Sequence, residues 1–178
     1  MLEWVIMITI RAERTEDFPA IHSVNLMAFG QEDEAFLVQR IRESSGFVPE
    51  LSLVAAKDSR IVGHILFSRI HIETPTESVV VLSLAPMAVL PEFQNSGIGS
   101  QLVRQGLKKC RELGHTIVVV IGHPEYYPRF GFIPARKKGL DLHFPVADEA
   151  FMVCELEPDA LEGITGMVKY PSEFSDVT

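Results

Sequence analysis

The most constraining feature of the sequence is a long apolar run that leads through a glycine-containing turn into an amphipathic segment. Val79–Val89 is apolar nearly throughout, which is typical of a strand covered on both faces. Pro91 ends this run, and Gln94–Gly99 leads into a helix with apolar side chains at three- and four-residue spacing, which ends at Gly114. The β-branched run Thr116–Ile121 follows. Together these segments predict a strand–helix–strand unit with parallel strands.

The other predicted elements surround this unit on both sides. They are strands over Ile6–Arg11, Leu51–Lys57, Arg60–Ser68 and Phe151–Leu156, with helices after Thr15–Asp17 and over Glu32–Glu43. The residues from Pro158 onward are weakly patterned, and no linker or internal repeat divides the sequence. A chain of 178 residues buries roughly 70% of its unfolded surface, so a single α/β domain with a sizeable core is expected.

Charge and targeting signals argue against several function classes. The 16 basic and 24 acidic residues give a net charge of −8, which repels phosphodiester backbones and anionic lipid. Neither nucleic acid nor a membrane is therefore expected as a partner. The apolar N-terminus lacks the basic segment and cleavage site of a signal peptide and the length of an anchor, which favours a cytoplasmic protein. Because Met7 is a second plausible start, residues 1–6 are interpreted as an N-terminal extension.

The glycine-containing turn is a candidate anion site. A helix N-terminus offers unpaired backbone N–H groups and a positive dipole end, and Gly97 and Gly99 let a phosphate approach the backbone closely. The turn is neither a GxGxxG dinucleotide fingerprint nor a Walker A loop, because no Gly-Lys-Ser/Thr follows. The alternative is a plain strand-to-helix turn whose glycines only permit tight packing.

Two landmarks in this region resemble the GNAT N-acetyltransferase superfamily. Gln94-x-x-Gly97-x-Gly99, after a long strand and at the start of a helix, is similar to the acetyl-CoA signature of that family. Tyr127-x-x-x-Gly-Phe132, shortly after a β-branched strand, resembles the second landmark, in which a tyrosine lies beside the coenzyme sulfur. The element order β-α-α-β-β-β-α-β-α-β-β also resembles the family order.

The resemblance implies an α/β GNAT fold, with a central mixed, twisted sheet flanked by helices. The acetyltransferase domain would span residues 7–157, with residues 158–178 as a tail packed on or extending it. The strand that ends at Val89 would splay from Val118–Ile121 and open a cleft for acetyl-CoA, the co-substrate; no metal is implied. The residues implied in coenzyme binding are Met87, Ala88, Val89, Gln94, Asn95, Ser96, Gly97, Ile98, Gly99 and Ser100.

The resemblance also implies direct attack of a neutral amine on the thioester, with Tyr127 as the general acid for the departing thiolate. Tyr126 is the rival acid, because Pro128 departs from the helix usual at this point in the family. Without the resemblance, either tyrosine is equally well an aromatic packing residue. No general base is assigned. The candidates near the ends of the cleft-forming strands are His123, Glu125 and Glu92, and a water chain would serve equally well.

The function implied is an acetyl-CoA-dependent N-acetyltransferase that acts on a primary amine of a small molecule or peptide. The alternatives are a non-catalytic acyl-CoA-binding sensor or interaction module and a transferase for another acyl group. The acidic residues around Gln31–Glu34 either bind a cationic amine or are simply solvated. A homodimer through the C-terminal strand or tail is compatible with the sequence.

The remaining polar residues carry weaker signals. Cys110 and Cys154 are too few and too far apart for a metal site or disulfide framework, so both are expected to be reduced core thiols. His64 and His71 are expected to be structural histidines. Two basic clusters are either solvated or contact an anion such as a coenzyme phosphate. They are the helix residues Arg104, Lys108, Lys109 and Arg111, and the loop Arg136–Lys138.

Overall fold

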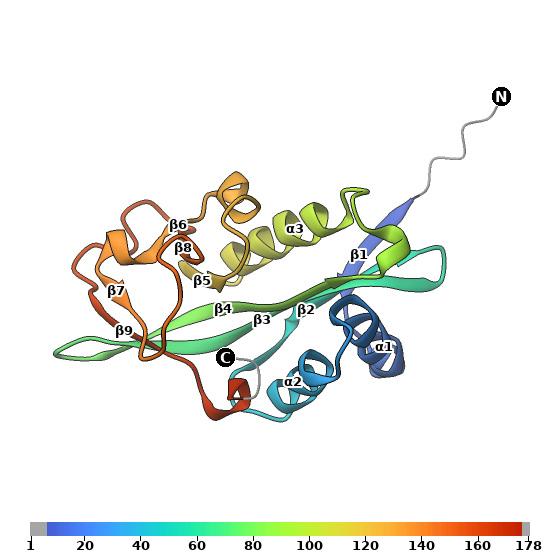
Figure 1. The fold of residues 1–178 in the computed structure, drawn as a ribbon, viewed down its shortest axis with the longest axis horizontal. Coiled ribbons are helices and arrows are strands. Elements are labelled where there is room, and N and C mark those ends of the chain that lie inside the picture. Colours follow the sequence, from blue (N-terminus) through green and yellow to red (C-terminus); the bar gives the residue numbers. More distant parts are fainter. Residues whose placement is uncertain (1–6, 176–178) are drawn as a thin grey trace.

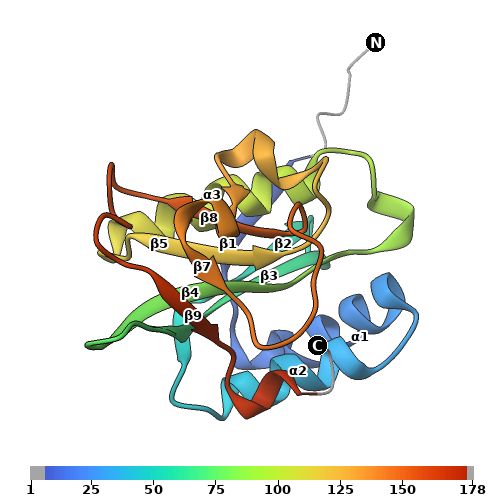
Figure 2. The ribbon, with the colours of Figure 1, turned by 60° about the vertical axis from the view of Figure 1, so that its left-hand side comes forward.

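The computed structural model describes residues 7–175, which form one nine-stranded sheet with helices on both faces (Figures 1 and 2). The strands are β1 (Ile8–Ala12), β2 (Phe47–Lys57), β3 (Arg60–Glu73), β4 (Ser78–Val89), β5 (Ile117–Ile121), β6 (Ile133–Pro134), β7 (Leu140–Asp141), β8 (Phe151–Glu155) and β9 (Gly166–Lys169). The helices are α1 (Phe18–Phe29), α2 (Asp33–Arg42) and α3 (Ile98–Glu112). The predicted N-terminal extension, residues 1–6, lies outside the described residues.

The sheet is mixed. Its strands follow the order β1-β2-β3-β4-β5-β8-β6, while β9 pairs with both β3 and β7. The β4–β5 and β7–β9 pairs are parallel, and the remaining pairs are antiparallel. The predicted strand–helix–strand unit is therefore confirmed as β4, α3 and β5, with β4 in the interior of the sheet.

The two faces of the sheet are covered by different helices. Helix α3 lies on one face, and α1 and α2 lie together on the other (Figure 1). Close packing of α3 depends on Gly106, where an added Cβ would come within 2.3 Å of a ring carbon of Phe67 in β3. Cys110 of the same helix and Cys154 of β8 are free and buried, as predicted. Burial raises the pKa of the Cys110 thiol to about 12, so this thiol is unreactive at neutral pH.

The predicted element order is wrong after β5. A helix was expected there, but the chain forms only a single 3-10 turn over Tyr127–Phe130. Pro128 lies in the first turn, and Gly131, with φ of +97°, ends it in the left-handed region. The short strands β6, β7 and β9 lie outside the predicted ranges. Strand β9 brings the weakly patterned tail into the sheet, where it pairs with residues 71–73 of β3.

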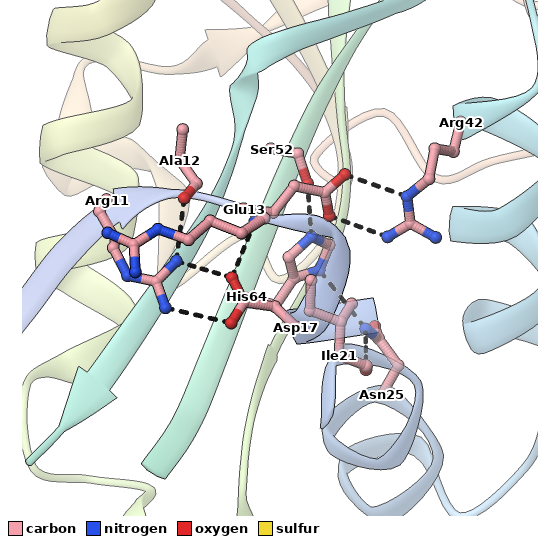
Figure 3. Close-up of polar contacts among 10 residues, drawn as sticks. Arg11, Ala12, Glu13, Asp17, Ile21, Asn25, Arg42, Ser52 and His64 are labelled. Atoms are coloured by element: carbon pink, nitrogen blue, oxygen red, sulfur yellow. Dashed lines mark hydrogen bonds and ion pairs between the residues drawn. The ribbon is translucent and has the colours of Figure 1, made fainter. Parts of the chain in front are cut away.

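A cluster of buried polar side chains joins α1 to the sheet (Figure 3). The His64 ring in β3 lies 2.9 Å from the Ser52 hydroxyl through Nε2 and 3.4 Å from the Asn25 amide nitrogen through Nδ1. The Asn25 amide also donates to the backbone oxygen of Ile21. Burial, with a smaller effect from the Arg42 charge, lowers the pKa of His64 to about 3. His64 is thus a neutral structural histidine, as predicted, whereas His71 is exposed.

Two ion pairs border this His64 cluster (Figure 3). Arg42 of α2 donates to both carboxylate oxygens of Glu13 at 3.0 and 2.8 Å. Arg11 of β1 donates to both carboxylate oxygens of Asp17. The hydrogen bond from Arg11 holds the pKa of Asp17 below its ordinary value. These pairs connect the start of the chain to both helices on this face of the sheet.

Candidate functional site

Strands β4 and β5 separate near their carboxyl ends. They pair at only two positions, Leu82 with Val118 and Ser83 with Val119, although β4 continues to Val89. The register between β3 and β4 also shifts at this point, because Ile65 faces Met87 while Phe67 faces Leu84. Two residues of β4 thus oppose one of β3, which is a β-bulge and bends the strand. The predicted splay between the two strands is confirmed.

A cavity of about 1080 Å³ lies where the strands separate. Ten of the sequence-predicted site residues line it: Met87, Ala88, Val89, Gln94, Asn95, Gly97, Gly99, Ser100, Tyr126 and Tyr127. Two others do not. The Ile98 side chain is buried in the core, and the Ser96 hydroxyl donates a hydrogen bond to the backbone oxygen of Phe93. The structure therefore brings both sequence landmarks to one cavity.

The N-terminus of α3 opens into this cavity. Gly97 caps the helix with φ of +88°, and an added Cβ there would meet nothing within 4 Å. The Gln94 side chain donates to the backbone oxygen of Val89 at 3.0 Å, which fastens the turn to the end of β4. The first N–H groups of a helix have no partner within the helix. An anion placed at Gly97–Ser100 would therefore meet backbone donors and the positive end of the helix dipole.

The two tyrosines line the cavity in different ways. Tyr127 is only 7% exposed, and its ring lies against the backbone of Gly122, where an added Cβ would come within 2.5 Å of the ring. Burial raises the pKa of Tyr127 above its ordinary value, so its hydroxyl remains protonated at neutral pH. The Tyr126 hydroxyl lies 3.4 Å from that of Ser100, at the first turn of α3. The Tyr126 and Tyr127 rings meet edge to face, with their centres 5.1 Å apart.

The basic residues singled out in the sequence do not line the cavity. Arg136 pairs with Asp141 and Asp148, and Lys138 pairs with Glu155. On α3, the Arg111 guanidinium donates to the backbone oxygen of Leu156. The remaining helix cations are placed as follows: Arg104 lies over the Phe130 ring, and Lys108 and Lys109 lie 3.9 Å from Glu112.

Arg129 is a cation at the cavity that the sequence analysis missed. Its guanidinium carbon lies 4.7 Å from the centre of the Tyr126 ring, the geometry of a cation–π contact. The signal that points to it is its place inside the second landmark, two residues after Tyr127. Arg129 supplies positive charge to a cavity in a chain whose net charge is −8.

Of the three candidate bases, His123 alone lines the cavity, where it follows the end of β5. Glu92 pairs with Arg60 at 2.9 Å on the surface. A backbone hydrogen bond and Arg60 hold the pKa of Glu92 below its ordinary value. Glu125 is exposed and outside the lining. Within residues 7–175, no three metal-ligating side chains form a group, and no helix is long and apolar enough to cross a membrane.

The far wall of the cavity was not predicted from the sequence. It is built from the end of α1, the start of α2, a loop before β8 and the segment after β9. The residues of this far wall are Ala28, Phe29, Glu34, Leu37, Phe144, Pro145, Val146, Tyr170 and Phe174. Only the acidic stretch Gln31–Glu34 had been considered from the sequence.

Comparisons with known proteins identify the family of this chain. The family model described as an acetyltransferase (GNAT) domain matches residues 9–135. The uncharacterised N-acetyltransferase YjhQ of Escherichia coli is 41% identical over 134 residues, 75% of this chain and 74% of its own. The uncharacterised N-acetyltransferase YhbS of the same species is 36% identical over 167 residues, 93% of this chain and 98% of its own.

Solved structures give the same result. The crystal structure of Escherichia coli YhbS in complex with CoA matches with a TM-score of 0.91 at 32% identity, covering 100% of this chain and 97% of that one. A GNAT family acetyltransferase from Brucella melitensis in complex with acetyl-CoA matches with a TM-score of 0.76 at 30% identity, covering 95% and 99%. The expected fold is thereby confirmed, and the chain belongs to the GNAT family of acetyltransferases.

Proposed function

We propose that this protein is an acetyl-CoA-dependent N-acetyltransferase that acetylates a primary amine. One observation carries the proposal: the N-terminus of α3, the open edge of β4 and two tyrosines face a single cavity. The cavity suits a long ligand with phosphates at one end and an amide-containing arm at the other. The similar YhbS and Brucella structures contain CoA and acetyl-CoA, which supports the same ligand here.

Backbone groups at the start of α3 and along β4 form the part of the cavity that we assign to the coenzyme, the coenzyme end. The free N–H groups at Gly97–Ser100 bind the pyrophosphate, because the open space beside Gly97 leaves room for its oxygens. Beyond Ser83, the unpaired edge of β4 offers N–H and C=O groups to the amides of the pantetheine arm. Arg129 adds a positive charge beside the phosphates. We further propose that residues 7–157 are the acetyltransferase domain and that residues 158–178 belong to the same unit.

Acetyl-CoA supplies the acetyl group as a thioester. The neutral amine nitrogen bonds to the carbonyl carbon, the carbon–sulfur bond breaks, and the sulfur leaves with that bonding pair. Tyr127 donates its hydroxyl proton to the departing sulfur and regains one from solvent before the next turnover, when burial again favours its protonated form. The amine loses one proton, for which His123 is the acceptor that the cavity lining offers. The cavity contributes mainly by holding the two reactants together.

A thermal-shift titration with acetyl-CoA, with adenosine as the control, tests the proposed coenzyme. Ligand at 100 times its Kd adds about 2.7 kcal/mol of stability, which raises Tm by roughly 5–10 °C in a chain of this size. No shift at millimolar acetyl-CoA would refute the site. Release of free thiol on adding amines then tests turnover. Tight binding without thiol release from any amine would instead support a non-catalytic acyl-CoA sensor.

A further inference from the structure

The far wall of the cavity differs in chemistry from the coenzyme end. Three aromatic side chains form a packed cluster there, with Phe144 and Tyr170 at its surface; Phe144 and Tyr170 ring centres lie 6.1 Å apart, and Tyr170 and Phe174 ring centres 5.0 Å apart. Their edge-to-face geometry is the favourable arrangement for aromatic pairs. Burial raises the pKa of Tyr170, so this side chain is uncharged at neutral pH. An apolar or aromatic group is the natural occupant of this surface.

The aromatic surface is held in place by α2. The Arg40 guanidinium of α2 donates from Nε to the backbone oxygen of Glu173 at 3.1 Å, next to Phe174. Phe174 itself is 2% exposed, so the segment is packed against the domain. Figure 2 shows this last turn of the described chain lying against α2. The aromatic surface and the start of α2 therefore form one wall.

Glu34 is the carboxylate of this wall. Among the described residues lining the cavity it is the only acidic side chain. The Gln31 side chain donates to both Glu34 oxygens, at 3.0 and 3.1 Å, and none of the ion pairs of the described residues includes Glu34. The cation of the lining, Arg129, belongs to the coenzyme end. The far wall thus combines a negative charge that lacks a cationic partner with an aromatic surface.

We propose that the far wall binds the acetyl acceptor, and that the acceptor is a primary monoamine with an aromatic or apolar body and no carboxylate. Its ammonium pairs with Glu34, and its body lies against Phe144 and Tyr170, behind which Phe174 packs. An amino acid with the same body is disfavoured, because its carboxylate would face Glu34. Polyamines and amino sugars are disfavoured, because they would leave polar groups against the aromatic surface. The inference rests on the proposed function, since the acceptor must share the cavity with acetyl-CoA.

Titration of the CoA-saturated full chain with 2-phenylethylamine and with L-phenylalanine tests the assignment without requiring turnover. We expect 2-phenylethylamine to bind at least about tenfold more tightly. The Glu34→Gln variant should lose about tenfold in affinity for 2-phenylethylamine. Glu32→Gln is the matched control, because Glu32 is exposed one residue before α2 and outside the lining. It should leave the affinity unchanged.

A second variant tests the aromatic surface. Phe144→Ala should weaken binding of 2-phenylethylamine and leave binding of propylamine nearly unchanged, because Phe144 is half-buried and contacts the body rather than the ammonium. Equal or tighter binding of phenylalanine, no binding of 2-phenylethylamine, or unchanged affinity in Glu34→Gln would overturn the inference. Acetyl-CoA titrations of the same variants keep the two proposals apart: retained coenzyme binding places the failure in the acceptor assignment, whereas lost binding in the parent chain refutes the proposed function.

Discussion

The His64 cluster and the cavity are two places where polar groups gather among the described residues, and they differ in whether those groups are paired within the protein. In the cluster, the His64 ring is hydrogen-bonded to both Ser52 and Asn25, and all three side chains are fully enclosed (Figure 3). In the cavity, the first N–H groups of α3 and the tyrosines face open space. Polar groups that satisfy one another hold a single conformation, whereas those that face a cavity remain available to a ligand.

The two places are only one strand apart, since His64 of β3 pairs with Ala88 of β4. The difference arises from strand pairing. Strand β3 is paired on both sides at His64, with Val54 of β2 and with Ala88. Strand β4 has lost its pairing with β5 at the same level. Mutations that affect one place and not the other therefore test whether the cluster serves stability and the cavity serves binding.

The largest effect is expected from filling the cavity at the first turn of α3. A Cβ on Gly99 would already lie 3.0 Å from the Tyr126 hydroxyl, so Gly99→Leu should occupy the phosphate site. We expect acetyl-CoA affinity to fall by at least about 100-fold, or about 2.7 kcal/mol, with Tm nearly unchanged. Isothermal titration and thermal unfolding measure the two quantities. Gln101→Leu on the exposed face of α3 is the control, and equal affinity losses in both variants would contradict the assignment.

Nearly as large an effect is expected from Tyr127, the proposed general acid. Tyr127→Phe should lower kcat by about 100-fold while leaving the KM for acetyl-CoA within about threefold. The raised pKa of Tyr127 means that it stays protonated, so the parent enzyme should show no loss of kcat from its deprotonation up to about pH 10. Tyr126→Phe is the matched variant. If it lowers kcat while Tyr127→Phe does not, the roles of the two tyrosines are reversed.

A smaller effect, on stability rather than binding, is expected in the His64 cluster. His64→Gln should destabilise the fold at pH 7 by about 1–3 kcal/mol, because it disturbs buried hydrogen bonds. The pKa of His64 is about 3 in the folded chain, below the ordinary 6.5 of the unfolded chain. The unfolded chain therefore takes up the proton first, so stability is full above pH 6.5 and is lost as the pH falls toward 3.

Denaturant unfolding at several pH values measures this loss. Between pH 6 and 4, the free energy of unfolding of the parent chain should fall by up to about 1.4 kcal/mol per pH unit on account of His64, and His64→Gln should lack this contribution. Acetyl-CoA affinity should be the same in both. Equal slopes in the two chains would show that the His64 ring is solvated and can be protonated in place.

The smallest effect is expected from Arg129, which is exposed at the rim of the cavity. Arg129→Gln should weaken acetyl-CoA binding about fivefold, and the loss should shrink as salt is added, since exposed charge interactions are screened. Titrations at 50 mM and 500 mM salt measure this. Lys137→Gln, which removes an exposed charge from the loop that does not line the cavity, should change nothing at either salt concentration. If Lys137→Gln weakened acetyl-CoA binding as much as Arg129→Gln, the loss would reflect only the change in the net charge of the protein.

Elements with long, regular sequence patterns were predicted more accurately than short ones. The apolar run of β4 and the helical spacing of α3 predicted both elements within about two residues, because long periodic segments determine their own structure. The two-residue strands β6 and β7 had no pattern to detect. Strand β9 forms because β3 offers it an edge, which is a tertiary cause. Pro128 pointed to the 3-10 turn, but the element order of the family that the sequence resembles favoured a helix at this position.

The residues of the candidate site also differ in how far the sequence predicted them. The proposed coenzyme end lies within two short stretches of sequence, so local motifs were enough to predict Gly97, Gly99 and the tyrosines, all of which line the cavity. The far wall assembles Phe29, Glu34, Phe144 and Phe174 from four distant segments. No local pattern distinguishes such residues from ordinary core or surface positions. Arg129 is a single cation within an aromatic motif, so no basic run marks it, whereas the basic run Arg136–Lys138 forms ion pairs with nearby acids.

The attachment of Glu173 to Arg40 has a consequence for how each molecule matures. A ribosome releases β4, α3 and β5 well before residues 170–174, and domains begin to fold during synthesis. In the proposed assignment, the residues of the coenzyme end are therefore synthesised before those of the aromatic surface of the far wall. The part of the cavity proposed to hold the acyl donor thus precedes, in the order of synthesis, the aromatic surface proposed to select the acceptor.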